Sequence, residues 1–272
     1  FFCYLNKINT YSLIGENMKY FKYALVITLC VLSFYASDRL ILYVENLSPL
    51  MKEIKMYEDS LYESPVNAII EDNTIISGKN GRELNKRESY LKMNDFGSFN
   101  ETFFVYDYIK PDISLKDNLD KIIIGNVDNS KIALIVNNKN VEKYLEEENI
   151  KFAKVINSCD EISSKNITYI NGGSNEDDFT DIKYCLKKSD LNKNICDVDT
   201  SHYASCINNK SYIIKSSGVI KSNNISKEIN NINGGTIVKI NPNLTLNEFK
   251  VYLSKIKYNN LEIIDLLDLI KE

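Results

Sequence analysis

The stretch KIALIVNN, residues 131–138, decides the fold of the chain. Five apolar residues, 132–136, follow one another without a break and end in the polar pair Asn137-Asn138. A continuous apolar run bounded by polar residues predicts a strand buried on both faces, as in a parallel sheet wrapped by helices. In folds of this kind, chemistry lies at the C-terminal ends of the strands. Asn137 and Asn138 occupy that position and are therefore the first candidates for a functional site.

The chain after residue 119 alternates between strand-like and helix-like segments. Strands are expected at 121–124, 132–136, 152–156, 167–170, 195–198, 212–214, 236–240 and 261–264. Helices are expected at 141–149, 179–188 and 225–230, with two more near the end of the chain. Thr245 and Glu248 form a capping box for a helix that runs to about Ile256, and Asp265 caps the last helix. This alternation indicates an α/β fold with a parallel sheet or barrel.

Residues 66–118 predict a small α+β unit that precedes this domain. Strands are expected at 66–71, 74–76 and 103–108, and a helix at 85–94. Gly78 and Gly81 flank Lys79-Asn80, and we interpret them as a turn that needs positive φ. A phosphate-binding loop is not favoured, because no Gly-Lys-Ser/Thr sequence follows.

The N-terminal segment predicts a membrane anchor. Lys19 and Lys22 precede an apolar stretch, and residues 18–42 are expected to form an uncleaved signal-anchor helix with its N-terminus inside the cell. A cleaved signal peptide is the alternative. Both interpretations place the rest of the chain outside the cytoplasm, and the anchor predicts a single-pass protein of the cell membrane. Residues 43–65 are expected to form a polar helical stalk that begins at Ser48-Pro49.

Residues 1–17 are expected to lie outside the translated protein, as untranslated sequence or an over-extended gene start. Met18 follows Gly15-Glu16-Asn17, whose codons could form a purine-rich ribosome-binding sequence. Finding residues before Met18 by N-terminal sequencing would contradict this hypothesis.

Composition and charge exclude some classes of function. The chain has 272 residues, of which 44% are hydrophobic, which is enough for a medium domain and a smaller one with a real core. The net charge is −4, and no basic stripe interleaved with aromatic residues is present, which argues against a nucleic-acid partner.

Six cysteines are present, and four of them lie in the outer part of the chain, at 159, 185, 196 and 206. These four allow three pairings, and the sequence does not choose among them. A bridge between Cys196 and Cys206 is consistent with an extracellular domain. Free buried thiols are equally compatible with the pattern.

Two stretches resemble the polysaccharide deacetylases of the NodB-homology type. KIALIVNNKN (131–140) resembles the first motif of that family, usually written KVALTFDDGP, and GGTIVKIN (234–241) resembles its pGSIiLLHD strand. Residues 247–272 resemble the closing elements of the family. Residues 66–115 resemble the unit that precedes such domains in membrane-anchored proteins of low-GC Gram-positive bacteria. The likeness covers 66–272 and implies a degenerate NodB-like (β/α) barrel over 119–272.

The family's catalytic positions hold amides in this chain. In the family, an Asp and two His hold a divalent metal, a second Asp of the first motif acts as base, and a last-strand His acts as acid. The matching positions here are Asn137, Asn138 and Asn241, and the HxxxH motif would fall near 171–179, which contains no His. An amide does not ionise to act as a base and is a poor metal ligand. The resemblance therefore implies a protein that does not run the family's reaction.

Two other groups of polar residues are candidate sites. Asp197, Asp199 and His202 could form a small metal site, although the spacing matches no standard motif and the stretch reads equally as a polar loop. Glu176, Asp177 and Asp178 could supply carboxylates for acid–base chemistry. The simpler interpretation is a solvated helix N-terminus, where acidic side chains interact favourably with the helix dipole.

Three hypotheses of function follow. The first is a membrane-anchored extracellular pseudoenzyme without a cofactor, which binds cell-wall glycan such as peptidoglycan or assists another enzyme. The second is an active hydrolase of carbohydrate N-acetyl groups that holds a divalent metal such as zinc through non-standard ligands. The third is a structural interaction module. The residues considered as non-standard ligands are Glu176, Asp177, Asp199 and His202.

Overall fold

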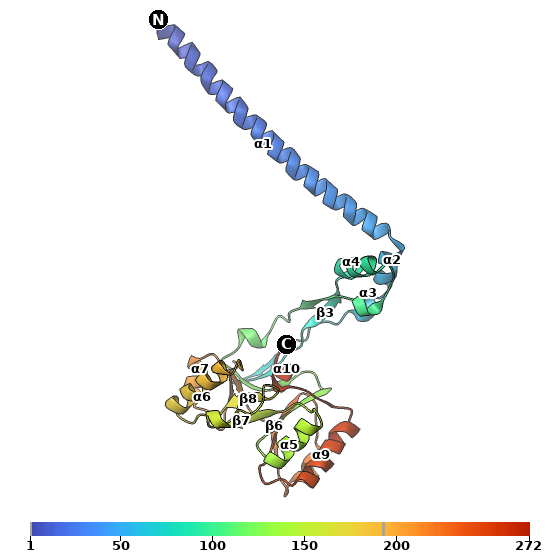
Figure 1. The fold of residues 1–272 in the computed structure, drawn as a ribbon, viewed down its shortest axis with the longest axis vertical. Helices are drawn as coiled ribbons and strands as arrows, with labels where there is room; N and C mark the ends of the chain where they lie inside the picture. Colours follow the sequence, from blue (N-terminus) through green and yellow to red (C-terminus); the bar gives the residue numbers. More distant parts are fainter. Residues whose placement is uncertain (1, 192–193) are drawn as a thin grey trace. The chain divides into compact units, whose positions relative to one another are not determined.

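The computed structural model describes residues 2–191 and 194–272, with side chains from residue 23 onwards. The chain forms two compact units, which are described separately (Figure 1). The first comprises residues up to Tyr62 together with Leu84–Asp107. The second comprises Glu63–Glu83 and Tyr108–Glu272. The predictions for residues 1–17 and for the Lys19 and Lys22 side chains fall outside the described side chains and stay predictions.

The second unit is a closed barrel of seven strands, as the sequence predicts. Neighbouring strands around the ring are β5 (Ile122–Asn126), β10 (Tyr212–Ile214), β9 (Ile195–Asp197), β8 (Thr168–Asn171), β7 (Ala153–Ile156), β6 (Lys131–Val136) and β12 (Thr236–Ile240). The pairs from β5 through to β12 are parallel. The ring closes through one antiparallel pairing between Gly125 of β5 and Thr236 of β12.

Further strands extend the sheet beyond this ring. β1 (Ile69–Glu71) pairs antiparallel with β2 (Thr74–Ser77), which runs parallel to β5. β11 (Gly218–Ile220) runs parallel to β12, and β13 (Glu262–Ile263) runs parallel to the start of β6. The first predicted strands of the small unit therefore belong to the sheet of the barrel.

Strand β6 is buried on both faces, which confirms the interpretation of its unbroken apolar run. Ala133 and Ile135 belong to the cluster inside the barrel, together with residues such as Ile170, Ile195 and Ile237. Ile132, Leu134 and Val136 belong to a second cluster on the outside of the barrel. Alternate residues of a strand point to opposite faces, so a strand covered on both sides must be apolar throughout.

Helices cover the outer face of the barrel. They are α5 (Lys139–Glu147), α6 (Glu176–Lys188), α7 (Tyr203–Asn208), α8 (Ile225–Asn230) and α9 (Leu246–Tyr258), with the 3-10 turn η3 (Cys159–Glu161). The last helix, α10 (Leu266–Ile270), and the 3-10 turn η2 (Leu115–Asp117) instead contribute apolar side chains to the interior cluster. α5 and α9 lie side by side next to β6 (Figure 1), where the rings of Tyr144 and Phe249 meet edge to face. The predicted capping box of Thr245 and Glu248 is present at the start of α9. Asp265 caps α10 as predicted.

The first unit contains α1 (Phe2–Leu47), α2 (Pro49–Met56), α3 (Glu58–Leu61), α4 (Lys86–Phe96) and the 3-10 turn η1 (Glu101–Phe103). β3 (Gly81–Leu84) and β4 (Tyr106–Ile109) form a separate two-stranded sheet. The prediction of a polar stalk is wrong for α2, because its Ile54 is fully buried with Leu84 and Met93. Met51 and Ile54 are three residues apart on one helix face, and this short apolar stripe suffices to pack α2 onto α4.

The predicted boundary at residue 118 is not a boundary between the two compact units. Leu84–Asp107 packs in the first unit with the helices from the predicted stalk, whereas β1 and β2 extend the barrel sheet. Aromatic contacts hold the small unit together. The ring of Tyr57 stacks on Phe99 at a centroid distance of 5.4 Å and lies equally close to Phe104.

Gly78 and Gly81 do not adopt the positive φ that the sequence predicts. Among the described glycines, only Gly97 and Gly235 have a positive φ. A Cβ at Gly78 would lie 2.4 Å from the carbonyl oxygen of Val66, and one at Gly81 would lie 2.5 Å from that of Glu63. Glycine is required here because the neighbouring backbone approaches too closely to leave room for a Cβ atom. The sequence pattern alone does not distinguish this requirement from that of a turn with positive φ.

Helix α1 contains one segment that is long and apolar enough to cross a membrane among the described residues. This segment, Tyr23–Leu47, has 25 residues and contains an 18-residue window with a mean hydropathy of 1.8. At about 1.5 Å per residue, its length exceeds the roughly 30 Å thickness of a bilayer core. It overlaps the predicted anchor at 18–42 over residues 23–42.

Candidate functional site

Asn137 extends the sheet beyond the last residue of β6. Its side-chain amide donates a hydrogen bond of 2.7 Å to the carbonyl oxygen of Val155 on β7. Its Oδ1 accepts a bond of 3.3 Å from the Val155 N–H. The side chain thus imitates a backbone peptide and fills the gap between β6 and β7. Both polar atoms of the amide are engaged in this role.

Asn138 caps helix α5 and holds the loop that follows β12. Its Oδ1 accepts bonds from the N–H groups of Asn140 and Val141, the first residues that a helix leaves without internal partners. Its Nδ2 donates to the carbonyl oxygens of Pro242 and Leu244, at 2.7 and 2.9 Å. The four hydrogen bonds satisfy the whole amide, which is only 8% exposed. An aspartate could keep the cap but could not donate to the two carbonyls.

Asn241 stands one residue after the end of β12. Its N–H donates to the Ile220 carbonyl oxygen at 3.0 Å, and its Oδ1 accepts from the Asn243 N–H at 2.9 Å. These bonds shape the loop whose carbonyls Asn138 holds. The structure therefore brings the ends of β6 and β12 together, as the resemblance implies, and gives the amides structural hydrogen bonds.

A buried ion pair lies at the same end of the barrel. The Nζ of Lys239 is 2.7 Å from Oδ2 of Asp197. Only 2% of the Asp197 side chain is exposed, and 23% of that of Lys239. Lys239 alternates along β12 with Ile237, which belongs to the interior cluster, so both residues face the inside of the barrel. The lysine therefore places a fixed positive charge in the interior, two residues before the family's acid position.

Lys239 is not among the site residues predicted from the sequence. A lysine at an inward position of an otherwise apolar strand (TIVKI) is itself a signal, because a buried ammonium requires a nearby anion. Asp197 was considered only as a metal ligand. The structure shows that its carboxylate neutralises the lysine.

The predicted metal candidates are engaged elsewhere. Nδ1 of His202 lies 2.8 Å from the Ser205 hydroxyl, at the start of α7. The N–H of Asp199 donates to Oδ1 of Asp197 at 3.2 Å. Among the described side chains, at 23–191 and 194–272, no cluster of three or more His, Cys, Asp or Glu residues could hold a metal ion. Together with the amides at the matched positions, this donor set does not fit the divalent metal of the deacetylases.

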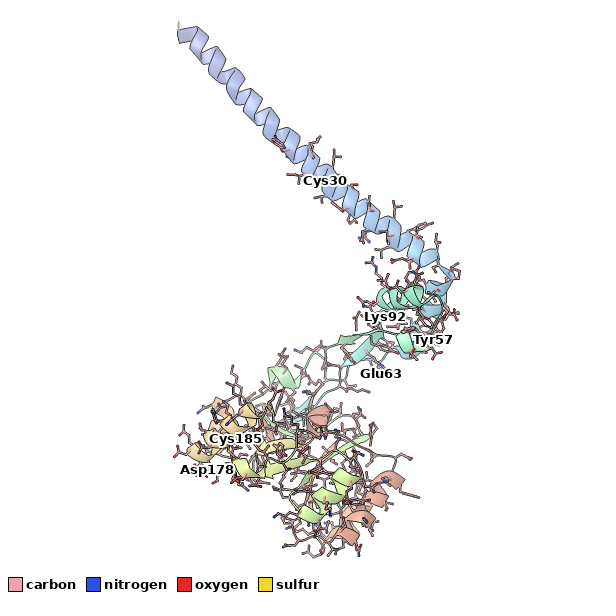
Figure 2. All side chains as sticks on the ribbon, in the orientation of Figure 1. Cys30, Tyr57, Glu63, Lys92, Asp178 and Cys185 are labelled. Atoms are coloured by element: carbon pink, nitrogen blue, oxygen red, sulfur yellow. A yellow bond between two sulfur atoms is a disulfide. The ribbon has the colours of Figure 1, made fainter. Side chains whose placement is uncertain are left out.

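Glu176, Asp177 and Asp178 form the first turn of α6 and are exposed to solvent. Oδ1 of Asn175 caps the helix by accepting a bond from the N–H of Asp178. Figure 2 labels Asp178 and Cys185 on this helix, near its beginning and in its second half. The three acids therefore interact with the helix dipole, as the simpler interpretation predicts.

Two disulfides stabilise the part of the barrel between residues 159 and 206. One joins Cys159 of η3 to Cys185 of α6, and the other joins Cys196 of β9 to Cys206 of α7. The second is the pair for which the sequence left a bridge and free thiols open. Cys30, labelled on α1 in Figure 2, is free and exposed.

No protein-family model matches the sequence. The uncharacterized protein YlxY of Bacillus subtilis is 31% identical over 99 residues, and this match covers 34% of the present chain. It spans about a third (31%) of the length of that curated relative.

Solved structures of BA3943 from Bacillus anthracis, described as a CE4 family pseudoenzyme, have a similar fold. The wild-type structure has a TM-score of 0.60 at 15% identity and covers 83% of this chain and 96% of its own. A mutant described as having restored enzymatic activity has a TM-score of 0.60 at 14% identity, with 83% and 99% covered. The comparison confirms the predicted deacetylase-like fold, that of the family 4 carbohydrate esterases.

Proposed function

We propose that this protein is a membrane-anchored deacetylase-like barrel that does not catalyse deacetylation and that engages cell-wall glycan outside the cytoplasm. The observation that carries the first part is the Lys239–Asp197 pair inside the barrel, at the end where the matched catalytic positions lie. A divalent cation placed there would meet an ammonium group and an already neutralised carboxylate. Both effects oppose metal binding.

The amides at the matched positions support the same conclusion. Metal-dependent hydrolysis of an acetamide needs a base that takes a proton from water, and neither Asn137 nor Asn138 ionises. Their hydrogen-bonding atoms are committed to Val155, to α5 and to the loop after β12. BA3943, which shares the fold, is described as a pseudoenzyme.

Anchoring and an exterior location are supported by two independent features. The Tyr23–Leu47 segment has the length and hydropathy of a membrane span. The two disulfides are of the kind that forms and persists in oxidising compartments. Protease added to intact cells is expected to degrade the barrel. Protection of the barrel in intact cells would contradict an exterior location.

The central test combines metal analysis with an acetate-release assay. The full chain in detergent micelles would be incubated with zinc, desalted and assayed for bound metal and for acetate released from N-acetylated chitin oligomers. We expect neither stoichiometric zinc nor acetate. Stoichiometric zinc together with acetate release would overturn the proposal and favour the active hydrolase with non-standard ligands. Glycan engagement is tested by sedimentation with purified peptidoglycan, and no recovery would favour a structural module.

A further inference from the structure

A cavity lies at the opposite end of β6 from the three amides. Its volume is about 440 Å³, within the range of small-ligand sites. Lys131, the first residue of β6, and Asp128 in the preceding loop contribute to its wall. Asn137 follows the last residue of the same strand, so about 20 Å of strand separates the two places. The rest of the wall is formed by residues of the second unit, at 78–80, 108, 126, 268–269 and 271–272.

The charges that line this cavity balance one another. Three lysines, at 79, 131 and 271, face three acids, at 128, 268 and 272. Lys131 Nζ lies 3.1 Å from Asp128, and Lys79 Nζ lies 3.2 Å from Glu63 just outside the cavity. One oxygen of Glu272 accepts a hydrogen bond from the Leu115 N–H. A cavity with this balance has no net attraction for an anion or a cation, and it favours a neutral ligand rich in hydrogen-bonding groups.

Tyr108 adds a flat aromatic surface to this polar wall. The residue is 77% exposed although it lines the cavity, so its ring is available to a ligand. An aromatic ring that carries a hydroxyl offers both an apolar face and a hydrogen bond at its edge. The ring faces and equatorial hydroxyls of a sugar are complementary to such a surface.

Solvent-exposed hydrogen-bonding groups are present in the same wall. Asp268 and Lys271 are exposed and can accept from and donate to further hydroxyls.

We propose that this cavity is a binding site for a neutral saccharide, with Tyr108 as the stacking surface and with Asp268 and Lys271 as hydrogen-bonding groups. The assignment rests on the proposed engagement of glycan and specifies where it occurs. Sugar binding would then lie at the end of the barrel away from the matched catalytic positions. Loss of the catalytic groups would leave this binding unaffected.

The test compares two equally exposed tyrosines. Tyr108→Ala removes the ring from the cavity, and Tyr258→Ala removes a ring on α9 that is also 77% exposed and lies outside the cavity. Triacetylchitotriose would be titrated calorimetrically into the full chain in detergent micelles, at low and high salt. We expect Tyr108→Ala to weaken the affinity about tenfold or more, and Tyr258→Ala to leave it unchanged. Affinity independent of salt is expected for a neutral ligand.

The outcomes distinguish failure of the proposed saccharide site from failure of the proposed glycan engagement. If Tyr108→Ala binds the trisaccharide like the wild type, the proposed site is wrong. A loss of trisaccharide affinity in Asn241→Ala would then place the sugar at the other end of the barrel. If the chain sediments with peptidoglycan but does not bind the trisaccharide, this cavity is again rejected while glycan engagement stands. If the chain binds neither, both proposals fail. An affinity that falls steeply with salt would replace the neutral saccharide by a charged ligand.

Discussion

The two ends of strand β6 differ in how their polar groups are used. At the C-terminal end, Asn138 makes four hydrogen bonds and Lys239 is paired with Asp197, so the side chains satisfy one another. At the N-terminal end, a cavity of about 440 Å³ is bordered by the exposed side chains of Tyr108, Asp268 and Lys271. The end that carries chemistry in the deacetylase fold is thus the internally closed one, and the opposite end remains open to a ligand.

The comparison shows how side chains at one end of a deacetylase-like barrel are used for structure. The amides at 137, 138 and 241 carry no charge, and their hydrogen-bond partners are backbone groups. These amides therefore stabilise the closed end. Each prediction below tests this contrast, from the largest expected effect to the smallest.

Of the single substitutions below, Asp197→Ala should produce the largest loss of stability. It leaves the Lys239 ammonium inside the barrel without its counter-ion, which is expected to lower the free energy of unfolding by about 3–5 kcal/mol. The measurement is urea denaturation of the barrel. Glu147→Gln breaks the exposed Lys143–Glu147 pair and serves as control, with an expected change below about 0.5 kcal/mol. Equal stability of Asp197→Ala and wild type would show that the closed end does not depend on this pair.

The double variant Asp197→Leu with Lys239→Met should recover most of the lost stability. It removes both charges together and leaves apolar groups of similar volume, an exchange that is often neutral or stabilising by about 1–4 kcal/mol in buried pairs. If the double variant is as unstable as Asp197→Ala, the loss comes from packing and not from an unpaired charge.

Reduction of the two disulfides should weaken the half of the barrel that they connect. They close loops of 26 and 10 residues, for which the chain-entropy estimate is about 3 kcal/mol each. Melting temperatures with and without a phosphine reductant provide the measurement. Cys30→Ser is the matched control, since Cys30 is free and exposed and its replacement should leave the melting temperature unchanged. An unchanged melting temperature after verified reduction would count against a stabilising role.

Asn138→Ala and Asn138→Asp should both destabilise the barrel, by about 2 kcal/mol. Alanine removes the cap of α5 and leaves the carbonyls of Pro242 and Leu244 without their donor. Aspartate keeps the cap and loses the same donor, so restoring the family residue at this position alone does not restore a native site. Asn230→Ala, an exposed asparagine of α8, is the control for amide removal. Wild-type stability of Asn138→Asp would mean that the loop after β12 does not need the amide.

The smallest effect concerns the cavity end and depends on pH. Burial alone would raise the pKa of Asp128, but hydrogen bonds from Ser130 and the nearby Lys131 outweigh it and lower the pKa to about 2. Because the folded pKa lies below the ordinary value of 3.8, the ionised carboxylate stabilises the fold above about pH 4. This contribution, about 1–2 kcal/mol, is lost as the pH falls toward 2.

Asp128→Asn should therefore be less stable than wild type at pH 7, and the difference should shrink toward pH 2. Unfolding free energies measured across this range provide the check. Asp268→Asn, an exposed neighbour in the same cavity, is expected to change stability by less than about 0.5 kcal/mol at either pH. A difference for Asp128→Asn that is constant with pH would indicate a packing effect in place of a titrating charge.

The sequence predicted those parts of the fold that depend on local patterns. The buried strand, the capping box of Thr245 and Glu248 and the cap of Asp265 each follow from residues close together in the chain. The packing of α2 on α4 was not predicted, because Ile54 meets Met93 across 39 positions and belongs to a helix that is polar on its other faces. The strand at Gly218–Ile220 and helix α7 were also missed, since each is short and surrounded by polar residues.

Some features of the candidate site were likewise predictable from the sequence, and others were not. The amides at 137, 138 and 241 are visible in the sequence, because a missing carboxylate or histidine is a matter of residue type alone. The tertiary structure decided which groups those amides bind. It also brings Lys239 to Asp197 across 42 positions and forms the cavity at the other end of β6. The reason is physical. Residue type sets what a side chain can do, whereas burial and the partners that the fold brings to it determine what it does.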